Sequence, residues 1–143
     1  MKYFLTGVVL SVSIIISAAT CKKETETGSY SKAVIGTWQW ARTDGGIANH
    51  IHETPASTGK QIELKLTADN KYYFYTNGNI ISEGTYSFRM EKSIHDHSEK
   101  PVIDFSADQD LMIHKIDQQN LELSDNAYDG VGIVYSRKTQ NSN

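Results

Sequence analysis

The sequence has a single cysteine, Cys21, so the folded chain cannot contain an internal disulfide. Its stability must therefore come from a hydrophobic core. Only two prolines occur, Pro55 and Pro101, and neither interrupts a candidate strand. The chain also lacks an apolar run of about 20 residues, the length that a membrane-spanning helix requires.

Positive charge and catalytic motifs are scarce as well. The chain has 14 Lys and Arg against 17 Asp and Glu, which argues against nucleic acid as a partner because phosphate binding needs a basic patch. It contains no Gly-X-Ser-X-Gly motif, no Gly-rich phosphate loop and no thiol besides Cys21. We therefore expect neither an enzyme nor a protein with a bound cofactor.

The N-terminus has the three parts of a secretory signal: a charged start with Lys2, an apolar run over residues 7–16, and small residues before Cys21. Small residues followed by cysteine resemble a bacterial lipobox. We expect residues 1–20 to be a lipoprotein signal peptide and Cys21 to be the lipidated N-terminus of the mature chain. The alternatives are an ordinary signal peptide that ends near a cysteine, or an uncleaved anchor helix.

Residues 21–32 are polar, charged and small, so we expect a flexible tether between the lipid and the domain. The run Lys22-Lys23-Glu24-Thr25-Glu26 resembles the export signals of some gram-negative surface lipoproteins. The predicted location is the outer membrane, with the domain displayed at the surface in preference to the periplasmic side.

Residues 33–140 alternate polar and apolar side chains in short runs separated by Gly, Asn and Asp, and no helical period extends beyond two turns. Asn77-Gly78 is the strongest hairpin signal. About eight strands follow, at residues 36–42, 61–67, 71–76, 79–89, 101–105, 111–116, 120–124 and 131–138. The short connections predict an all-β, antiparallel, up-and-down barrel in preference to an open sandwich, with a disordered tail at 141–143.

Two connections are long, residues 43–60 and 91–100. Successive connections of an up-and-down barrel alternate between its two ends, so we expect these two segments at opposite ends. Long loops in a compact domain are commonly functional. We expect residues 43–60 to form a flap over the mouth of the barrel.

The motif Gly36-Thr37-Trp38 on the first strand and the motif Tyr135-Ser136-Arg137 on the last resemble the lipocalin-like lipoproteins of gram-negative bacteria, within the calycin group. The resemblance implies that Gly36, Trp38 and Arg137 close the barrel floor, with the guanidinium packed over the indole. A cation–π contact of this kind is physically reasonable.

The histidines form two His-X-His pairs, His50 with His52 and His95 with His97. Such a pair could contribute to a zinc or copper site. Because the two pairs are expected at opposite ends of the barrel, we expect solvated loops and no metal. His114 alternates with apolar neighbours, which favours a position in the core or in a cavity wall.

Aromatic side chains offer the best candidate ligand surface, since a small barrel either fills its interior or holds one small ligand. The predicted cavity walls are Trp40, Tyr72, Phe74, Tyr86 and Tyr135. We expect non-catalytic binding of a small hydrophobic or amphipathic ligand. The alternative is an envelope protein-protein interaction module with a filled barrel, which contacts its partner through residues 43–60.

The first prediction concerns Cys21. In a gram-negative host supplied with labelled palmitate, the wild-type chain should incorporate label and Cys21→Ser should not. Thr20→Ala, which places a commoner residue before the cysteine, should label at least as well as the wild type. Equal labelling of Cys21→Ser and wild type would contradict lipidation at this residue.

Overall fold

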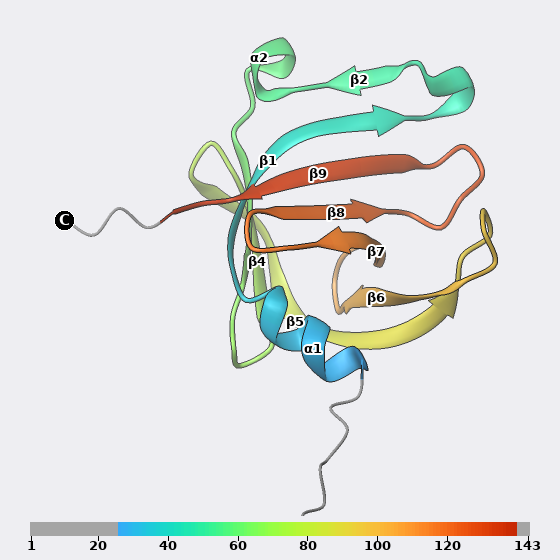
Figure 1. The fold of residues 1–143 in the computed structure, drawn as a ribbon. Coiled ribbons are helices and arrows are strands. Elements are labelled where there is room, and N and C mark those ends of the chain that lie inside the picture. Colours follow the sequence, from blue (N-terminus) through green and yellow to red (C-terminus); the bar gives the residue numbers. More distant parts are fainter. Residues whose placement is uncertain (1–25, 140–143) are drawn as a thin grey trace, which may run out of the picture.

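The structure is a computed structural model that describes residues 26–139; Cys21, the signal segment 1–20 and the tail 141–143 lie outside the described residues. Figure 1 shows the arrangement of its helices and strands. In chain order they are α1 (Glu26–Ala33), β1 (Gly36–Gly45), η1 (Ile47–Asn49), β2 (Ile51–Glu53), α2 (Pro55–Thr58), β3 (Ile62–Leu66), β4 (Lys71–Thr76), β5 (Asn79–Lys92), β6 (Glu99–Phe105), β7 (Leu111–Ile116), β8 (Asn120–Ser124) and β9 (Val131–Arg137).

The strands form one closed antiparallel sheet. Each strand from β3 to β9 pairs with the next along the chain, and β1 pairs with β3 on one edge and β9 on the other. The prediction of an eight-stranded up-and-down barrel is therefore confirmed, with β2 as an additional strand. Closure leaves no free edge along the β1–β9 seam, which removes a site for unwanted strand pairing.

Alternation along the strands explains the core. In β8, Leu121 and Leu123 are buried while Glu122 between them faces outward, which is the period of two expected of a strand with one buried face. The same pattern on the other strands produces one interior cluster. Its buried members are Val34, Trp38, Trp40, Leu64, Leu66, Tyr72, Tyr86, Ile103, Phe105, Leu111, Ile113, Leu121, Leu123 and Tyr135.

The floor of the barrel is closed by Trp38 and Arg137. The guanidinium carbon of Arg137 lies 4.0 Å from the centre of the Trp38 ring, and the indole N–H donates to the carbonyl of Val34 at 2.7 Å. Gly36 has φ +144°, and a Cβ there would lie 2.5 Å from Nη1 of Arg137. This position therefore requires glycine, both for its backbone conformation and for the close approach of the arginine.

The sequence predicts a flexible tether up to residue 32, and this is wrong for its second half, because residues 26–33 form the helix α1. The helix has little amphipathic pattern, so its sequence alone does not indicate it. Packing against the floor accounts for it: Tyr30 contacts the core, and the amide of Val34 donates to the carbonyl of Tyr30. No helix within residues 26–139 has the length and apolar character needed to cross a membrane.

The predicted flap is also wrong, because residues 43–60 continue the wall instead of folding over the mouth. β3 pairs with β1 only as far as Gln39, and β2 pairs with Thr43 to Gly45 further along β1. The turn between β1 and β2 contains η1, and α2 follows β2 with a capping box at Thr54 and Ser57. The segment is therefore a hairpin extension of the sheet.

Residues 93–98 do not lie remote from the other loops, contrary to the prediction of opposite ends. β5 has 14 residues and changes partners, pairing with β4 through residues 79–85 and with β6 through residues 86–92. This long bent strand carries its end towards the β8–β9 loop, where Asn126 bonds to Ile94 and Lys92. The turns after β1, β5 and β8 lie on the right in Figure 1.

The floor contact yields a stability prediction. Arg137 donates to the carbonyls of Ala33, Ile35 and Gln118 at 2.8 Å each, in addition to stacking on Trp38. Arg137→Ala should lower the free energy of unfolding by about 3 kcal/mol in urea denaturation, because it removes these bonds and the stacking.

Arg137→Lys should lose about half as much, because an ammonium group keeps the charge without the guanidinium geometry. Lys115→Gln is the control. Its ion pairs with Asp117 and Glu122, at 3.6 and 3.8 Å, are exposed and should contribute less than about 1 kcal/mol. Equal losses for Arg137→Ala and Lys115→Gln would contradict the role of the floor contact.

Candidate functional site

The aromatic residues predicted to line a cavity form the packed interior. Trp40, Tyr72, Tyr86 and Tyr135 are each 4% exposed or less, and Phe74 is partly buried against the same cluster. The rings pack edge to face: the Tyr72 ring centre lies 4.8 Å from that of Phe105 and 5.7 Å from that of Phe74. These are favourable aromatic contacts that fill the space a ligand would use.

The polar atoms of these rings are also engaged by the protein. The Tyr72 hydroxyl donates to Asp108 at 2.8 Å, the Tyr86 hydroxyl donates to the carbonyl of Thr67 at 2.8 Å, and the Trp40 N–H donates to Thr43 at 2.9 Å. Burial, and then the Asp108 carboxylate, raise the pKa of Tyr72. The hydroxyls of Tyr72 and Tyr86 therefore already have protein partners. The Tyr135 hydroxyl has no hydrogen-bond partner among residues 26–139, and burial raises the pKa of Tyr135.

Within residues 26–139, grooves of about 330, 370 and 360 Å³ open on the outside of the barrel, and none of these three is lined by the five predicted aromatic residues. The second is formed by β4 and β5 around Lys71 and Tyr73. The third lies beside the floor, around Lys65 and Arg137. The first crosses β7, β8, β9 and β1, and we call it the wall groove.

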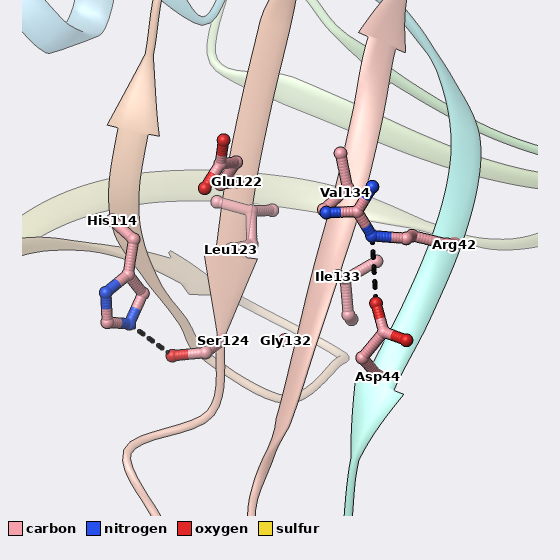
Figure 2. A pocket seen from close by; sticks show the side chains of 9 residues that line it. All are labelled: Arg42, Asp44, His114, Glu122, Leu123, Ser124, Gly132, Ile133 and Val134. Atoms are coloured by element: carbon pink, nitrogen blue, oxygen red, sulfur yellow. Dashed lines mark hydrogen bonds and ion pairs between the residues drawn. The ribbon is translucent and has the colours of Figure 1, made fainter. Parts of the chain in front are cut away.

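Figure 2 shows the side chains of the wall groove. Its lining residues are Arg42, Asp44, His114, Glu122, Leu123, Ser124, Gly132, Ile133 and Val134. Arg42 reaches from β1 across β9, and its Nε donates to Asp44 at 2.8 Å. His114 and Ser124 lie on the opposite side of the groove, 2.6 Å apart.

A β-bulge places Arg42 on the outer wall. Trp40 pairs with Tyr135 while Arg42 pairs with Val134, so β1 has one extra residue at Ala41. Without it, Arg42 would follow Trp38 and Trp40 into the core. The sequence signal for this bulge is a charged residue at an inward position of a strand.

The second bulge lies in β7, where Ile113 pairs with Leu123 and Lys115 pairs with Glu122, leaving His114 as the extra residue. Ile113 faces the core, so alternation places its neighbour His114 on the exposed wall, and the bulge turns Lys115 outward as well. The prediction of a core or cavity-lining position for His114 in the barrel interior is therefore wrong. Nε2 of the His114 ring faces the Ser124 hydroxyl, and Nδ1 lies 3.5 Å from Nζ of Lys100.

The roles of the two His114 ring nitrogens depend on the tautomer. If Nδ1 accepts from the Lys100 ammonium group, 3.5 Å away, the proton lies on Nε2, which then donates to Ser124. A serine nucleophile needs the opposite tautomer.

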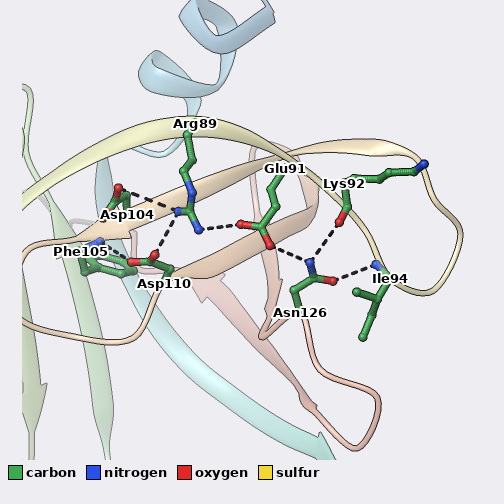
Figure 3. A network of polar contacts seen from close by, with 8 residues as sticks. All are labelled: Arg89, Glu91, Lys92, Ile94, Asp104, Phe105, Asp110 and Asn126. Atoms are coloured by element: carbon green, nitrogen blue, oxygen red, sulfur yellow. Dashed lines mark hydrogen bonds and ion pairs between the residues drawn. The ribbon is translucent and has the colours of Figure 1, made fainter.

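A polar network fixes the β8–β9 loop, as Figure 3 shows. The Asn126 side chain accepts from the amide of Ile94 at 3.0 Å and donates to Glu91 at 2.7 Å and to the carbonyl of Lys92 at 3.1 Å. Glu91 in turn accepts a hydrogen bond from Arg89, which also donates to Asp110 at 3.0 Å. The network therefore links the β5–β6, β6–β7 and β8–β9 loops.

The fixed β8–β9 loop presents exposed side chains, and it lies beside two other loops. The amide of Gly46, next to η1, donates to the carbonyl of Gly130 at 3.0 Å, which joins the first turn to the β8–β9 loop. Tyr128 is 82% exposed and Ile47 is 69% exposed. The ring of His95 lies 6.4 Å from that of Tyr128. We call these turns, residues 46–50, 93–98 and 125–130, the loop surface.

The segments with the two His-X-His pairs contact other groups of the protein. His52 lies 2.9 Å from Asp44, and His50 lies 2.6 Å from the carbonyl of Ile47. Lys100, and then Ser98, lower the pKa of Asp96 beside His95 and His97. Within residues 26–139, no group of three or more His, Cys, Asp or Glu side chains is arranged to hold a metal ion.

Comparison with models of protein families, with characterised proteins and with solved structures gives no match to this chain. The functional argument therefore depends on the residues and their geometry.

The wall groove yields a prediction on pH. Partial burial, and then the charge of Lys100, lower the pKa of His114 below its ordinary value of 6.5. Because the unfolded chain then binds the proton more tightly than the folded chain, stability should fall as the pH drops below 6.5. Titration of the His114 ring by NMR checks the direction of the shift.

Lys100→Met should raise the pKa of His114, because it removes a neighbouring cation. Lys115→Met is the matched control, since Lys115 is next to His114 in sequence but pairs with Asp117 and Glu122. An unchanged titration in Lys100→Met, or a larger change in Lys115→Met, would show that Lys100 does not set the protonation of His114.

Proposed function

We propose that the chain is a lipid-anchored, non-catalytic interaction module of the outer membrane, which binds a protein partner through the loop surface. The lipid anchor at Cys21 and the lipocalin-like character come from the sequence motifs. The interior packing supports the filled-barrel alternative over an internal ligand. Recognition then takes place on the outside of the barrel.

The observation that carries this proposal is an exposed aromatic side chain on a rigid loop. Tyr128 is 82% exposed, yet its loop is fixed by Asn126, by the bond from the amide of Val131 to Asp125 at 2.9 Å, and by Gly130. Tyrosine is enriched among residues that dominate binding energy. A loop ordered in advance binds at a lower entropic cost.

Charge indicates the kind of partner. The loop surface contains three acidic residues, Asp96, Asp125 and Asp129, and no lysine or arginine. Ile47 adds a second exposed apolar side chain to this surface. A protein with an apolar pocket and a basic rim would complement this surface.

A photo-crosslinking amino acid placed at residue 128 of the full anchored chain tests the proposal on intact cells. Irradiation should give a discrete protein adduct, and adding Ile47→Asp should reduce it at least about fivefold, because a buried charge is unfavourable in an apolar contact. The same amino acid at Thr85, an exposed position of β5, is the control and should give no discrete adduct.

Equal adducts from positions 128 and 85 would contradict binding through the loop surface. The carrier alternative has a separate readout. Organic extraction of the purified chain should release no molecule in stoichiometric amount, because Trp40 and its neighbours fill the interior. A stoichiometric molecule, together with altered NMR shifts of the Trp40 indole after extraction, would establish an internal ligand instead.

A further inference from the structure

The wall groove combines features that the proposed protein interaction does not use. One polar side is set by a β-bulge, at Ala41 before Arg42, and the other is formed by His114 and Ser124. Bulges redirect side chains and are frequent beside functional sites. Polar groups of β1, β7 and β8 thus flank the same short stretch of β9, residues 132–134.

The floor of the groove is apolar and contains a hollow at Gly132. Gly132 pairs with Ser124 on β8 and with Asp44 on β1, so the missing side chain leaves a gap between these two residues. A Cβ at this position would meet only the carbonyl oxygen of Asp44, at 3.9 Å. Neither backbone conformation nor crowding therefore demands glycine here. Val134 continues the apolar floor along the strand.

Arg42 is the one arginine or lysine among the residues that line the groove, which also include the acidic Asp44 and Glu122. Asp44 accepts a hydrogen bond from Arg42 and contacts His52. His52, and then Arg42, lower the pKa of Asp44, so this carboxylate stays ionised. Glu122 has Lys115 at 3.8 Å. Arg42 uses Nε for Asp44, and within residues 26–139 its two terminal nitrogens have no hydrogen-bond partner.

A guanidinium edge with two free N–H groups matches a carboxylate in a bidentate pair.

The size of the groove limits the remainder of the ligand. The floor from Gly132 to Val134 spans about 7 Å of strand, and the groove has a volume of about 330 Å³, near the lower end for small-molecule sites. A long acyl chain would extend beyond the floor into solvent.

We propose that the wall groove binds a small carboxylic acid with a compact apolar group, the carboxylate on Arg42 and the apolar group in the hollow at Gly132. The site is separate from the barrel interior and from the loop surface. Because it is open to solvent, its ligand exchanges freely and is lost on purification.

The test uses residues 21–143 with Cys21→Ser, followed by amide NMR, and 4-methylpentanoate as the probe. The acid should shift the amides of residues 132–134 and Ser124 saturably, with a Kd of about 1 mM for a ligand of this size. 4-Methylpentanamide, of the same shape without the charge, should bind at least about tenfold more weakly.

Gly132→Val should abolish binding by filling the hollow, with an otherwise unchanged spectrum, because valine suits an extended strand. Arg42→Gln should weaken binding about tenfold and provides a second variant that leaves the floor intact. Ser136→Val, on the same face of β9, is the matched control and should bind like the wild type.

Binding of the amide or of 4-methylpentylammonium as tight as that of the acid would overturn the carboxylate assignment. Shifts centred on Trp40 and Tyr135 would move the site to the interior and overturn the proposal. Acetyl-Ala-Leu with a free C-terminus binding more than about tenfold tighter than the acid would assign the groove to a peptide terminus instead. Absence of saturable shifts would remove the site altogether.

Discussion

The stacking of Arg137 on Trp38 is the contact on which the remaining structure depends. It stands where the first and last strands of the barrel meet, and its guanidinium also bonds to the carbonyls of Ala33, Ile35 and Gln118. One side chain therefore joins α1, the start of β1, the β7–β8 turn and β9. In a domain without a disulfide, this contact fixes the seam by charge-assisted hydrogen bonds and aromatic stacking.

Closure at the floor has a consequence for where recognition can occur. The interior behind Trp38 is packed with aromatic rings, and the hydroxyls of Tyr72 and Tyr86 have protein partners, so adding a ligand there would require displacing well-packed side chains. The outer surface has the opposite character. It carries an exposed tyrosine on a fixed loop and a hollow floored by Gly132. The proposed recognition sites therefore both lie on the outer surface.

The strands could be predicted because polar and apolar residues alternate along the sequence, as they do around Leu121 and Leu123 of β8. The closed barrel followed from short connections. Other features depend on tertiary context. α1 has too weak a pattern to be recognised before Tyr30 meets the floor, and the convergence of loops depends on the bend of β5. The wall groove was missed because a single extra residue, at Ala41, reverses the face of Arg42, and strict alternation places that residue inside.

The pairing of β1 with β9 also bears on the timing of folding. The bonds from Arg137 to Ala33 and Ile35 join residues more than 100 positions apart, so the seam can close only after nearly the whole chain is available. Contacts of such sequence separation form slowly, because the entropy of closing the loop must be lost before they contribute. If the chain is exported as its sequence predicts, the seam would close only after β9 had also crossed the membrane.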